Sequence, residues 1–348
     1  MMRAAIREIA YYLPEGVVTN ADLETDFPEW SMDKIESKTG ICSRHIAAPG
    51  ECSSDLAVQA AQRLFASGAC DPTGIDYLLL CTQSPDYFLP TTACTLQQRL
   101  GMRTSAGALD FNLGCSGYVY GLGLAQGLIV SGQAERVLLV TAETYSKFIH
   151  NRDKSVRTLF GDAAAATLLA AVPEAEGSIP APFVFGTDGR GAGNLIVPAG
   201  AFRKPPGPDT GRETSDEQGN VRSEEQLYMN GAEIFTFTLR EIPDCVNRLL
   251  QKAKLTVADV DLFVFHQANQ YMLEHLRKKM RLPAEKFCVF LRDCGNTVSS
   301  TIPIALKEAR QSGQLQDGQR VMLVGFGVGY SWGATLLRWP NLELLASA

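Results

Sequence analysis

An internal duplication constrains the fold of this chain more than any other feature of its sequence. Three apolar segments of the first half have counterparts in the second half: 76–83 resembles 261–267, 135–140 resembles 319–324, and 166–169 resembles 334–337. A repeat of this kind indicates that the two halves share one arrangement of secondary structure. The segments are continuous apolar runs, which are typical of strands buried on both faces in sheets that helices cover on each side.

Helical stretches separate these runs in both halves. The sequence pattern predicts helices over residues 54–67, 91–100, 116–130, 231–252, 269–280 and 299–311. Each half ends in two apolar runs with a short connection, which permits antiparallel pairing of the last two strands. The sequence therefore predicts an α/β protein made of two duplicated halves.

Two tracts interrupt the pattern. Pro, Glu and Gly break it near Ala171–Pro182, so we expect the halves to be residues 1–175 and 176–348. The tract from Ala199 to Gln226 contains the run Pro205–Pro208 and many Gly, Ser, Asp and Glu residues. This composition predicts a long flexible excursion, which is either a solvated loop or a lid beside a binding site.

The composition excludes several classes of protein. The 348 residues, 45% hydrophobic and 20% charged, are enough for a large core. The chain has neither the roughly 18 consecutive apolar residues of a membrane span nor a secretory signal, so we expect a soluble cytoplasmic protein without membrane insertion. A net charge of -6 argues against nucleic acid as a partner. Nine cysteines without zinc-site spacing indicate buried thiols and no metal site.

Cys115 has a setting that the other cysteines lack. It follows the apolar run Ala106–Phe111 and comes directly before a predicted helix. The unpaired N–H groups and the positive end of the helix dipole favour a thiolate there, so we expect a lowered pKa and a nucleophilic thiol. Gly114 and Gly117 beside it permit close approach of a substrate. The alternative is a small buried cysteine that only packs the helix.

His266 and Asn296 are the residues we expect to act with Cys115. His266 ends the apolar run 261–265, at the carboxyl end of a strand, where α/β sheets bind ligands. Its imidazole can donate a hydrogen bond to an enolate or transfer a proton, and a core histidine is the alternative. Asn296 enters the helix that the duplication pairs with the helix after Cys115, so we expect it to mirror the nucleophile. A plain turn or N-cap asparagine is the alternative.

The glycine-rich segment Gly325–Gly333 joins the last two predicted strands. Its glycines let backbone N–H groups approach a substrate oxygen, so we expect the loop, at Val328, to form an oxyanion hole with the N–H of Cys115. A simple hairpin turn is the alternative. The segment lacks the Lys-Ser/Thr pair of a phosphate-binding loop.

These residues lie in motifs that resemble those of the 3-oxoacyl-[acyl-carrier-protein] synthase III family, the initiating condensing enzymes of thiolase fold. The resemblance runs almost end to end, and several motifs in order are more specific than any one. The motifs are Lys38–Ile41, Arg44–Pro49, Gly114–Gly117, Phe160–Asp162, His266–Asn269, Gly295–Thr297 and Ser331–Gly333. The resemblance implies a thiolase-like fold with a layered αβαβα core.

The resemblance also implies a Cys-His-Asn triad of Cys115, His266 and Asn296. An acyl primer passes from acyl-coenzyme A to Cys115 and is condensed with malonyl-acyl carrier protein, giving 3-oxoacyl-carrier protein for fatty acid or related lipid synthesis. Two uncharged donors suit the enolate, because a nearby carboxylate would oppose its charge. Coenzyme A enters as part of the substrate, and the resemblance implies no metal or redox cofactor.

Binding residues follow from the same resemblance. Lys38 and Lys154 stand where relatives often carry arginine, and they would meet the phosphates of coenzyme A as point charges. Relatives form homodimers in which the chain around Pro85–Pro90 reaches the partner's acyl pocket. Leu89 replaces an aromatic residue there, which implies a longer or unusual acyl group.

A docking helix for the acidic carrier protein is implied after His266. The family uses basic residues on this helix, and Tyr271 replaces the expected arginine. Arg277–Lys279 and Arg281 offer positive charge instead, and a solvated helix face is the alternative.

Three other functions are compatible with these residues. A synthase-III-like acyltransferase of secondary metabolism would keep Cys115 and His266 but pass the acyl group to another nucleophile. A Cys-His-Asn thioester hydrolase would use the histidine as a base for the thiol proton. A non-catalytic partner subunit would not become acylated.

Overall fold

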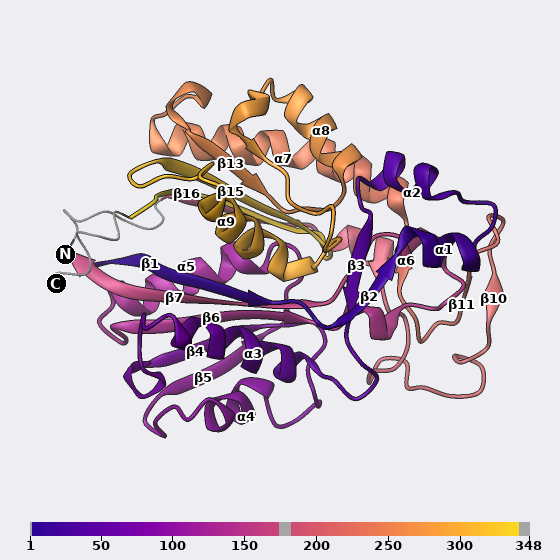
Figure 1. Ribbon diagram of the computed structural model, residues 1–348, viewed down its shortest axis with the longest axis horizontal. Coiled ribbons are helices and arrows are strands. Elements are labelled where there is room, and N and C mark those ends of the chain that lie inside the picture. The colour runs from indigo at the N-terminus through magenta and orange to yellow at the C-terminus, as the bar shows by residue number, and fades with distance from the viewer. Residues whose placement is uncertain (1, 174–181, 341–348) are drawn as a thin grey trace.

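The computed structural model describes residues 2–173 and 182–340, which contain two five-stranded sheets (Figure 1). The first sheet has the order β1-β7-β6-β4-β5, with strands β1 (Met2–Tyr12), β4 (Tyr77–Cys81), β5 (Gly107–Phe111), β6 (Arg136–Glu143) and β7 (Ala163–Pro173). The second has the order β14-β13-β15-β16-β8, with strands β8 (Phe183–Thr187), β13 (Leu262–Phe265), β14 (Phe287–Cys288), β15 (Arg320–Gly327) and β16 (Ser331–Arg338).

The two sheets repeat one topology. β4 lies parallel between β5 and β6, and β13 lies parallel between β14 and β15. The next strand is antiparallel in both, β7 on β6 and β16 on β15. The predicted duplication and the antiparallel pairing are therefore confirmed. The connection between the paired strands is short only in the second half, because in the first half it is the longer segment 144–162 with helix α6 (Lys154–Arg157).

Six helices lie within two residues of their predicted ends and complete the layers. They are α3 (Ser53–Ala66), α4 (Thr92–Arg99), α5 (Gly117–Val130), α7 (Gly231–Ala253), α8 (Gln270–Lys279) and α9 (Thr301–Gln311). Residues of α3 and α4 pack on the outer face of the first sheet, and those of α7 and α8 on the outer face of the second. Helices α5 and α9 share a core with both sheets. The layered αβαβα core is thus confirmed.

Helix α5 shows how the sequence sets the spacing of the middle layer. It is apolar on nearly all sides because it lies between two sheets. A Cβ added to Gly121 would lie 2.6 Å from Leu139 Cδ1, so the glycine permits the close approach of α5 to β6.

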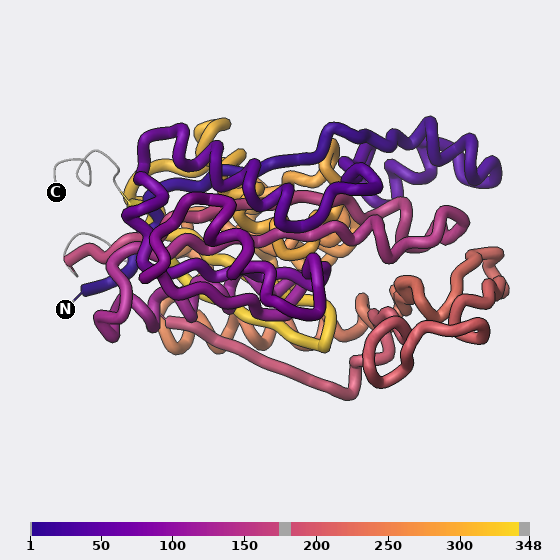
Figure 2. Tube along the Cα trace, turned by 90° about the horizontal axis from the view of Figure 1, so that it is seen from below, coloured from indigo at the N-terminus to yellow at the C-terminus, as the bar shows by residue number. Residues whose placement is uncertain are grey.

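A small layer projects from one end of the core (Figures 1 and 2). Strands β2 (Gly16–Thr19) and β3 (Ser43–Ile46) pair antiparallel and flank helices α1 (Asn20–Asp26) and α2 (Met32–Thr39). A capping box between Thr19 and Asp22 begins α1, and Gly40, at φ 72°, ends α2 in the left-handed conformation.

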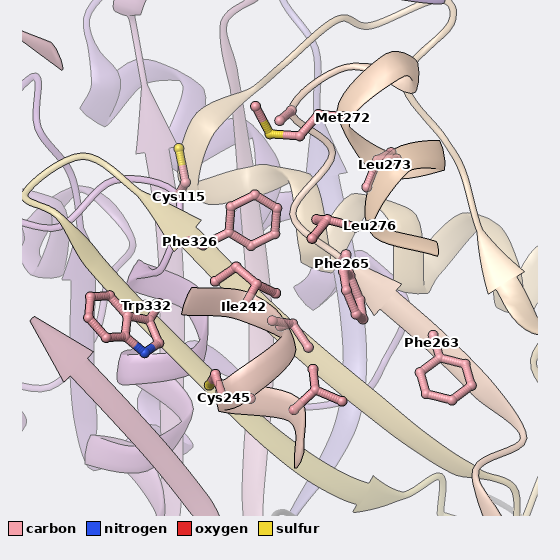
Figure 3. Close-up of a cluster of buried hydrophobic side chains, with 14 of the residues drawn as sticks. Cys115, Ile242, Cys245, Phe263, Phe265, Met272, Leu273, Leu276, Phe326 and Trp332 are labelled. Carbon is pink, nitrogen blue, oxygen red and sulfur yellow. The ribbon is translucent and has the colours of Figure 1, made fainter. Parts of the chain in front are cut away.

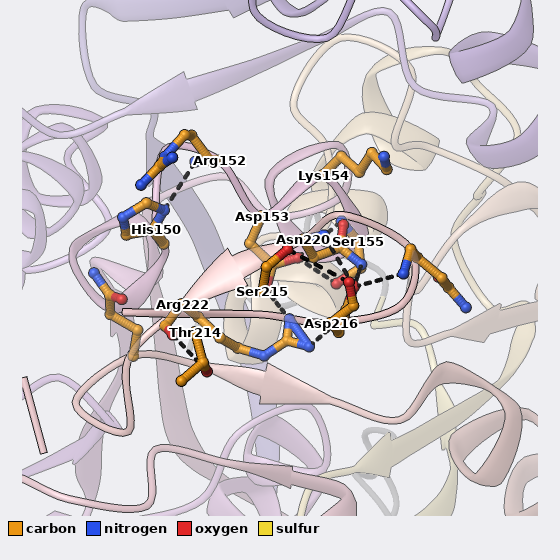
Figure 4. A network of polar contacts seen from close by, with 12 residues as sticks. His150, Arg152, Asp153, Lys154, Ser155, Thr214, Ser215, Asp216, Asn220 and Arg222 are labelled. Atoms are coloured by element: carbon orange, nitrogen blue, oxygen red, sulfur yellow. Dashed lines mark hydrogen bonds and ion pairs between the residues drawn. The ribbon is translucent and has the colours of Figure 1, made fainter. Parts of the chain in front are cut away.

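The tract 199–226 lies at the same end of the molecule as this layer (Figure 2). It is an excursion from the core, as expected, but it has internal order. Strands β9 (Leu195–Ile196) and β12 (Tyr228–Met229) pair at its base, and β10 (Thr214–Ser215) pairs with β11 (Val221–Arg222) near its tip. Arg222 lies 2.6 Å from both Asp153 and Asp216, and the Asp153 side chain is 1% exposed (Figure 4). A buried ion pair therefore fastens the excursion to the segment before α6.

The predicted boundary at residue 175 falls between β7 and β8, in 174–181, outside the described residues. None of the helices within 2–173 and 182–340 is long and apolar enough to cross a membrane.

Candidate active site

Cys115 lies in the turn between β5 and α5, next to the end of β15 (Figure 3). The residue is 5% exposed. A Cβ added to Gly327 would lie 2.9 Å from Cys115 Sγ, so the strand leaves room for the sulfur because its last residue is glycine. The backbone N–H groups of Cys115 and Val328 lie beside the sulfur and act to lower the pKa of the thiol. The structure therefore brings the Val328 loop to Cys115.

The prediction of a lowered thiol pKa is wrong for this resting structure. Burial, followed by the charge of Glu143, raises the pKa of Cys115 to about 12, and the two N–H donors offset only part of that rise. Removal from water and a nearby carboxyl group outweigh the helix terminus. The thiol is protonated at neutral pH, so it must lose its proton during acyl transfer.

His266 follows β13 and is held on three sides. Its backbone N–H donates to the Val324 carbonyl at 2.8 Å, and its Nδ1 lies 2.8 Å from Thr301 Oγ1, at the start of α9. Phe326 meets the imidazole edge-on, with ring centroids 5.5 Å apart. Burial lowers the pKa of His266 to about 3, so the imidazole is neutral and has one N–H to donate.

Asn296 is fixed by backbone bonds to the other half of the molecule. Its N–H donates to the Leu159 carbonyl at 2.9 Å, and its carbonyl accepts from Gly161 N–H at 3.0 Å. The side-chain Oδ1 accepts from Val298 N–H at 2.9 Å, which leaves the NH₂ end to donate to a substrate oxygen. The Val298 backbone also contacts the His266 imidazole, so Asn296 and His266 lie beside the same residue.

Asn296 does not mirror Cys115, as the sequence had led us to expect. Cys115 lies two residues before Gly117, the first residue of α5, and the same position before Thr301, the first residue of α9, is Ser299. The 3₁₀ turn Val298–Ser300 separates Asn296 from α9 and accounts for the shift. Asn296 therefore approaches the site from an extra turn, and Ser299 holds the equivalent position.

Lys38 and Lys154 lie in one neighbourhood, and both already have intramolecular partners. Lys154 Nζ lies 2.6 Å from a carboxylate oxygen of Glu29. Lys38 Nζ lies 4.7 Å from the ring centroid of Trp30, the residue next to Glu29. A Cβ added to Gly219 of the excursion would lie 3.9 Å from Lys154 Nζ. The excursion therefore borders this pair of lysines.

Leu89 lies on the surface of the chain. It is 81% exposed, beside the exposed residues Tyr87 and Phe88. The Phe88 ring packs on Phe202 of the excursion, with centroids 5.6 Å apart, and Phe202 is itself exposed. These four residues, 87–89 and 202, form an apolar cluster on the surface.

The basic residues of α8 are partly neutralised. Arg277 and Lys278 both pair with Glu274, at 2.6 and 3.3 Å. Tyr271 is exposed and packs against His275 with ring centroids 4.1 Å apart. Positive charge on this face thus comes mainly from Lys279 and Arg281.

Sequence reasoning missed Glu143 and Ser299, which form a buried pair at 2.7 Å beside the site. Extending the aligned segments 135–140 and 319–324 by three residues pairs Glu143 with Gly327. An acidic residue at the end of an apolar strand, opposite a glycine, was the available signal.

Comparison with known proteins identifies the family. Residues 109–189 match the family model described as 3-Oxoacyl-[acyl-carrier-protein (ACP)] synthase III, and residues 250–339 match the model of its C-terminal region. The beta-ketoacyl-[acyl-carrier-protein] synthase III of Symbiobacterium thermophilum is 39% identical over 94% of this chain and 95% of its own. The beta-ketoacyl-[acyl-carrier-protein] synthase III 1 of Bacillus cereus is 37% identical over 97% and 99%.

A solved structure agrees. The crystal structure of a 3-oxoacyl-(acyl-carrier-protein) synthase III is 57% identical, with a TM-score of 0.95, and covers 97% of this chain and 99% of that chain. Sequence and fold thus match over nearly the whole length. The chain belongs to the 3-oxoacyl-[acyl-carrier-protein] synthase III family of acyltransferases.

Proposed function

We propose that this enzyme loads an acyl group from acyl-coenzyme A onto Cys115 and condenses it with a malonyl group on acyl carrier protein. The products are 3-oxoacyl-acyl carrier protein, carbon dioxide and free coenzyme A. Its relatives are named as synthases of this class. The observation that carries the proposal is the buried thiol of Cys115, beside which the backbone N–H groups of Cys115 and Val328 lie.

Acyl loading uses the turn of Cys115. The sulfur attacks the thioester carbonyl, the bond from the acyl carbon to the coenzyme A sulfur breaks, and the thiol proton leaves with coenzyme A. The N–H groups of Cys115 and Val328 lie beside the sulfur, and we assign them to stabilise the carbonyl oxygen when it becomes negative. Their backbone origin fixes them in advance, so no reorganisation is needed.

Condensation uses the turn of Asn296 and the imidazole of His266. Loss of carbon dioxide from the malonyl group leaves an electron pair that spreads onto the thioester oxygen as an enolate. The Asn296 NH₂ group and one N–H of neutral His266 supply hydrogen bonds to that oxygen. The enolate carbon then attacks the acyl carbonyl, the bond to Cys115 sulfur breaks, and the sulfur regains a proton.

Coenzyme A and the carrier protein are each assigned to a group of basic residues. Lys38 and Lys154 lie together beside the excursion and suit the phosphates of coenzyme A, which would compete with Glu29 for Lys154. The charges of Lys279, the last residue of α8, and of Arg281 just after it suit the acidic carrier protein. A cytoplasmic location is part of this proposal.

A homodimer is also part of the proposal. The cluster of Tyr87, Phe88, Leu89 and Phe202 exposes between 64% and 88% of each residue, which is typical of an interaction surface. A second copy of the chain is the expected partner, with Leu89 entering the acyl pocket of that copy. Sedimentation of the wild type and of Phe202→Ser tests this part.

Intact-protein mass spectrometry across a panel of acyl-coenzyme A thioesters tests the main proposal. Cys115→Ala should abolish acylation, whereas His266→Ala and Asn296→Ala should acylate and fail to condense. Cys288→Ala is the matched control, because it removes another buried thiol, which lies on β14.

The same experiment separates the rival functions. Unchanged labelling of Cys115→Ala would refute the nucleophile. Acylation without a malonyl-dependent product would indicate transfer to another nucleophile, and slow loss of the acyl group to water would indicate a hydrolase. A chain that no thioester acylates would be a non-catalytic subunit.

A further inference from the structure

Glu143 occupies the position in the first half that Gly327 occupies in the second. In the parallel ladders Tyr77 pairs with Val137 and Leu262 pairs with Val321, which makes Val137 equivalent to Val321. Six residues further, β6 ends at Glu143 and β15 ends at Gly327. Gly327 faces Cys115, and Ser299 is the equivalent of Cys115. We therefore expect Glu143 to face Ser299. The hydrogen bond from Ser299 Oγ to Glu143 Oε1, at 2.7 Å, shows that it does.

Three donors surround the Glu143 carboxyl group. Besides Ser299, the Gln83 N–H donates to Oε2 at 3.0 Å and the Ser84 hydroxyl at 3.3 Å. Glu143 is fully buried, and no ion pair to it occurs among residues 2–173 and 182–340. A buried carboxyl group without a cation is costly to retain when charged, so its hydrogen bonds are its only compensation.

These bonds connect the two catalytic turns. On one side, Gln83 packs on the turn of Cys115, because a Cβ added to Gly114 would lie 2.5 Å from Gln83 Oε1. Tyr145 fixes the same Oε1 with a hydrogen bond of 2.6 Å. On the other side, Ser299 belongs to the 3₁₀ turn whose Val298 holds Asn296. Glu143 therefore lies between the element that carries the thiol and the element that carries the amide.

We propose that Glu143 is a positioning residue that holds the Cys115 and Asn296 turns together, and that its negative charge, when present, opposes ionisation of the Cys115 thiol. The proposal rests on the assignment of Cys115 as the nucleophile. It adds a residue that touches neither substrate and acts through its neighbours and its charge.

The charge of Glu143 depends on pH. Burial raises the pKa of Glu143 to about 8, against the lowering effect of its three hydrogen bonds. The titratable groups that face it are Asp162, Cys81, Cys115 and Tyr145. None of these four is a cation, so Glu143 carries a proton at neutral pH. The site is then free of the carboxylate that would oppose both the thiolate and the enolate.

The rate of Cys115 alkylation by iodoacetamide, followed on the Cys115 peptide by mass spectrometry from pH 6 to 10, tests the proposal. In the wild type we expect the logarithm of the rate to rise with pH and to flatten above about pH 8, where Glu143 ionises. In Glu143→Gln the rise should continue, giving a rate about five-fold or more above wild type at pH 10. Parallel lines for the two proteins would overturn the proposal.

Two more variants make the test independent of one substitution. Ser299→Ala removes a bond that favours the charged carboxyl group, so the flattening should move to higher pH, and an unmoved break would count against the proposal. Thr141→Val is the matched control on the same strand, because Thr141 bonds to Ser300 and not to Glu143. Its profile should match the wild type. Alkylation needs no acyl transfer, so this test can fail while the proposed function stands.

Discussion

The ends of β15 and β6 are equivalent places in the two halves, and they differ in what faces the following helix. Gly327 ends β15 and leaves space for Cys115 Sγ, whereas Glu143 ends β6 and binds Ser299. The next residue also differs in its use. The N–H of Val328 lies beside the Cys115 sulfur, while the N–H of the equivalent Thr144 donates to Ser84 Oγ at 2.9 Å.

A second equivalent pair shows the same division. The strand registers also make Cys81 equivalent to His266. Each side chain faces the first residue of a helix in the middle layer, Gly117 of α5 or Thr301 of α9. A Cβ added to Gly117 would lie 2.2 Å from Cys81 Sγ, while Thr301 Oγ1 lies 2.8 Å from His266 Nδ1. The duplication supplies two equal frames. One leaves room for the sulfur of the buried nucleophile, and the other holds the polar groups assigned to the second step.

Of the changes that test this comparison, Gly327→Ala should have the largest effect, on the rate of acyl loading. The new Cβ would lie 2.9 Å from both Cys115 Cβ and Sγ, so the thiol must move. A misplaced reacting atom costs about 100-fold in rate. We expect the rate of acyl loading to fall by at least that factor, measured by mass spectrometry of samples quenched at set times.

Gly127→Ala is the control for this substitution. Gly127 lies in α5, the helix that follows Cys115, and an added Cβ there meets nothing within 4 Å. It should load at the wild-type rate and gain about 0.5–1 kcal/mol in the free energy of unfolding. Equal loading by wild type and Gly327→Ala would show that Gly327 does not set the space for the sulfur.

The pH dependence of stability should separate Glu143 from all other groups. Its pKa rises from 4.5 to about 8 on folding, so the folded state keeps a proton that the unfolded state loses. The contribution of this proton to the free energy of unfolding is complete below about pH 4.5. It falls by about 1.4 kcal/mol per pH unit up to pH 8 and is constant above that. Urea unfolding of the wild type minus that of Glu143→Gln should follow this line, and a flat difference would contradict it.

Most of the fold was predictable because burial leaves a direct mark on sequence. The apolar runs that became β4, β6, β13 and β15 are buried on both faces, and their similarity between halves showed the duplication. The internal order of the excursion was not predictable, because it depends on contacts with distant residues, among them the ion pair of Arg222 with Asp153.

The sequence predicted the residues of the candidate site better than it predicted their pKa values. Cys115 and His266 stand at a helix start and a strand end that a linear pattern reveals, and Asn296 lies in the segment that leads to α9. The equivalence of Asn296 with Cys115 failed because the 3₁₀ turn at 298–300 has no counterpart in the pattern. The raised pKa of Cys115 was missed because it depends on burial and on Glu143, which meet only in the folded chain.

Thr301→Val should have a moderate effect and tests the His266 side of the comparison. The Thr301 hydroxyl lies 2.8 Å from His266 Nδ1 and donates to the Val298 carbonyl at 3.1 Å, so it ties the imidazole to the turn before α9. Without this contact the imidazole should turn away from the position in which it serves the enolate. Condensation should fall about 10-fold, part of the roughly 100-fold that loss of an oxyanion donor costs. Loading should persist, and Thr301→Ser should restore turnover.

Ser299→Cys should have the smallest effect, because it places a thiol in the equivalent frame without the features that make Cys115 reactive. The introduced sulfur would face Glu143 where Cys115 faces Gly327. It would also lack the second N–H donor, since Thr144 N–H is bound to Ser84. We expect mass spectrometry to find one acyl group per chain, on Cys115 alone. A second acyl group would show that a thiol at a helix start is sufficient, and that the glycine and the free N–H are not what distinguishes the two halves.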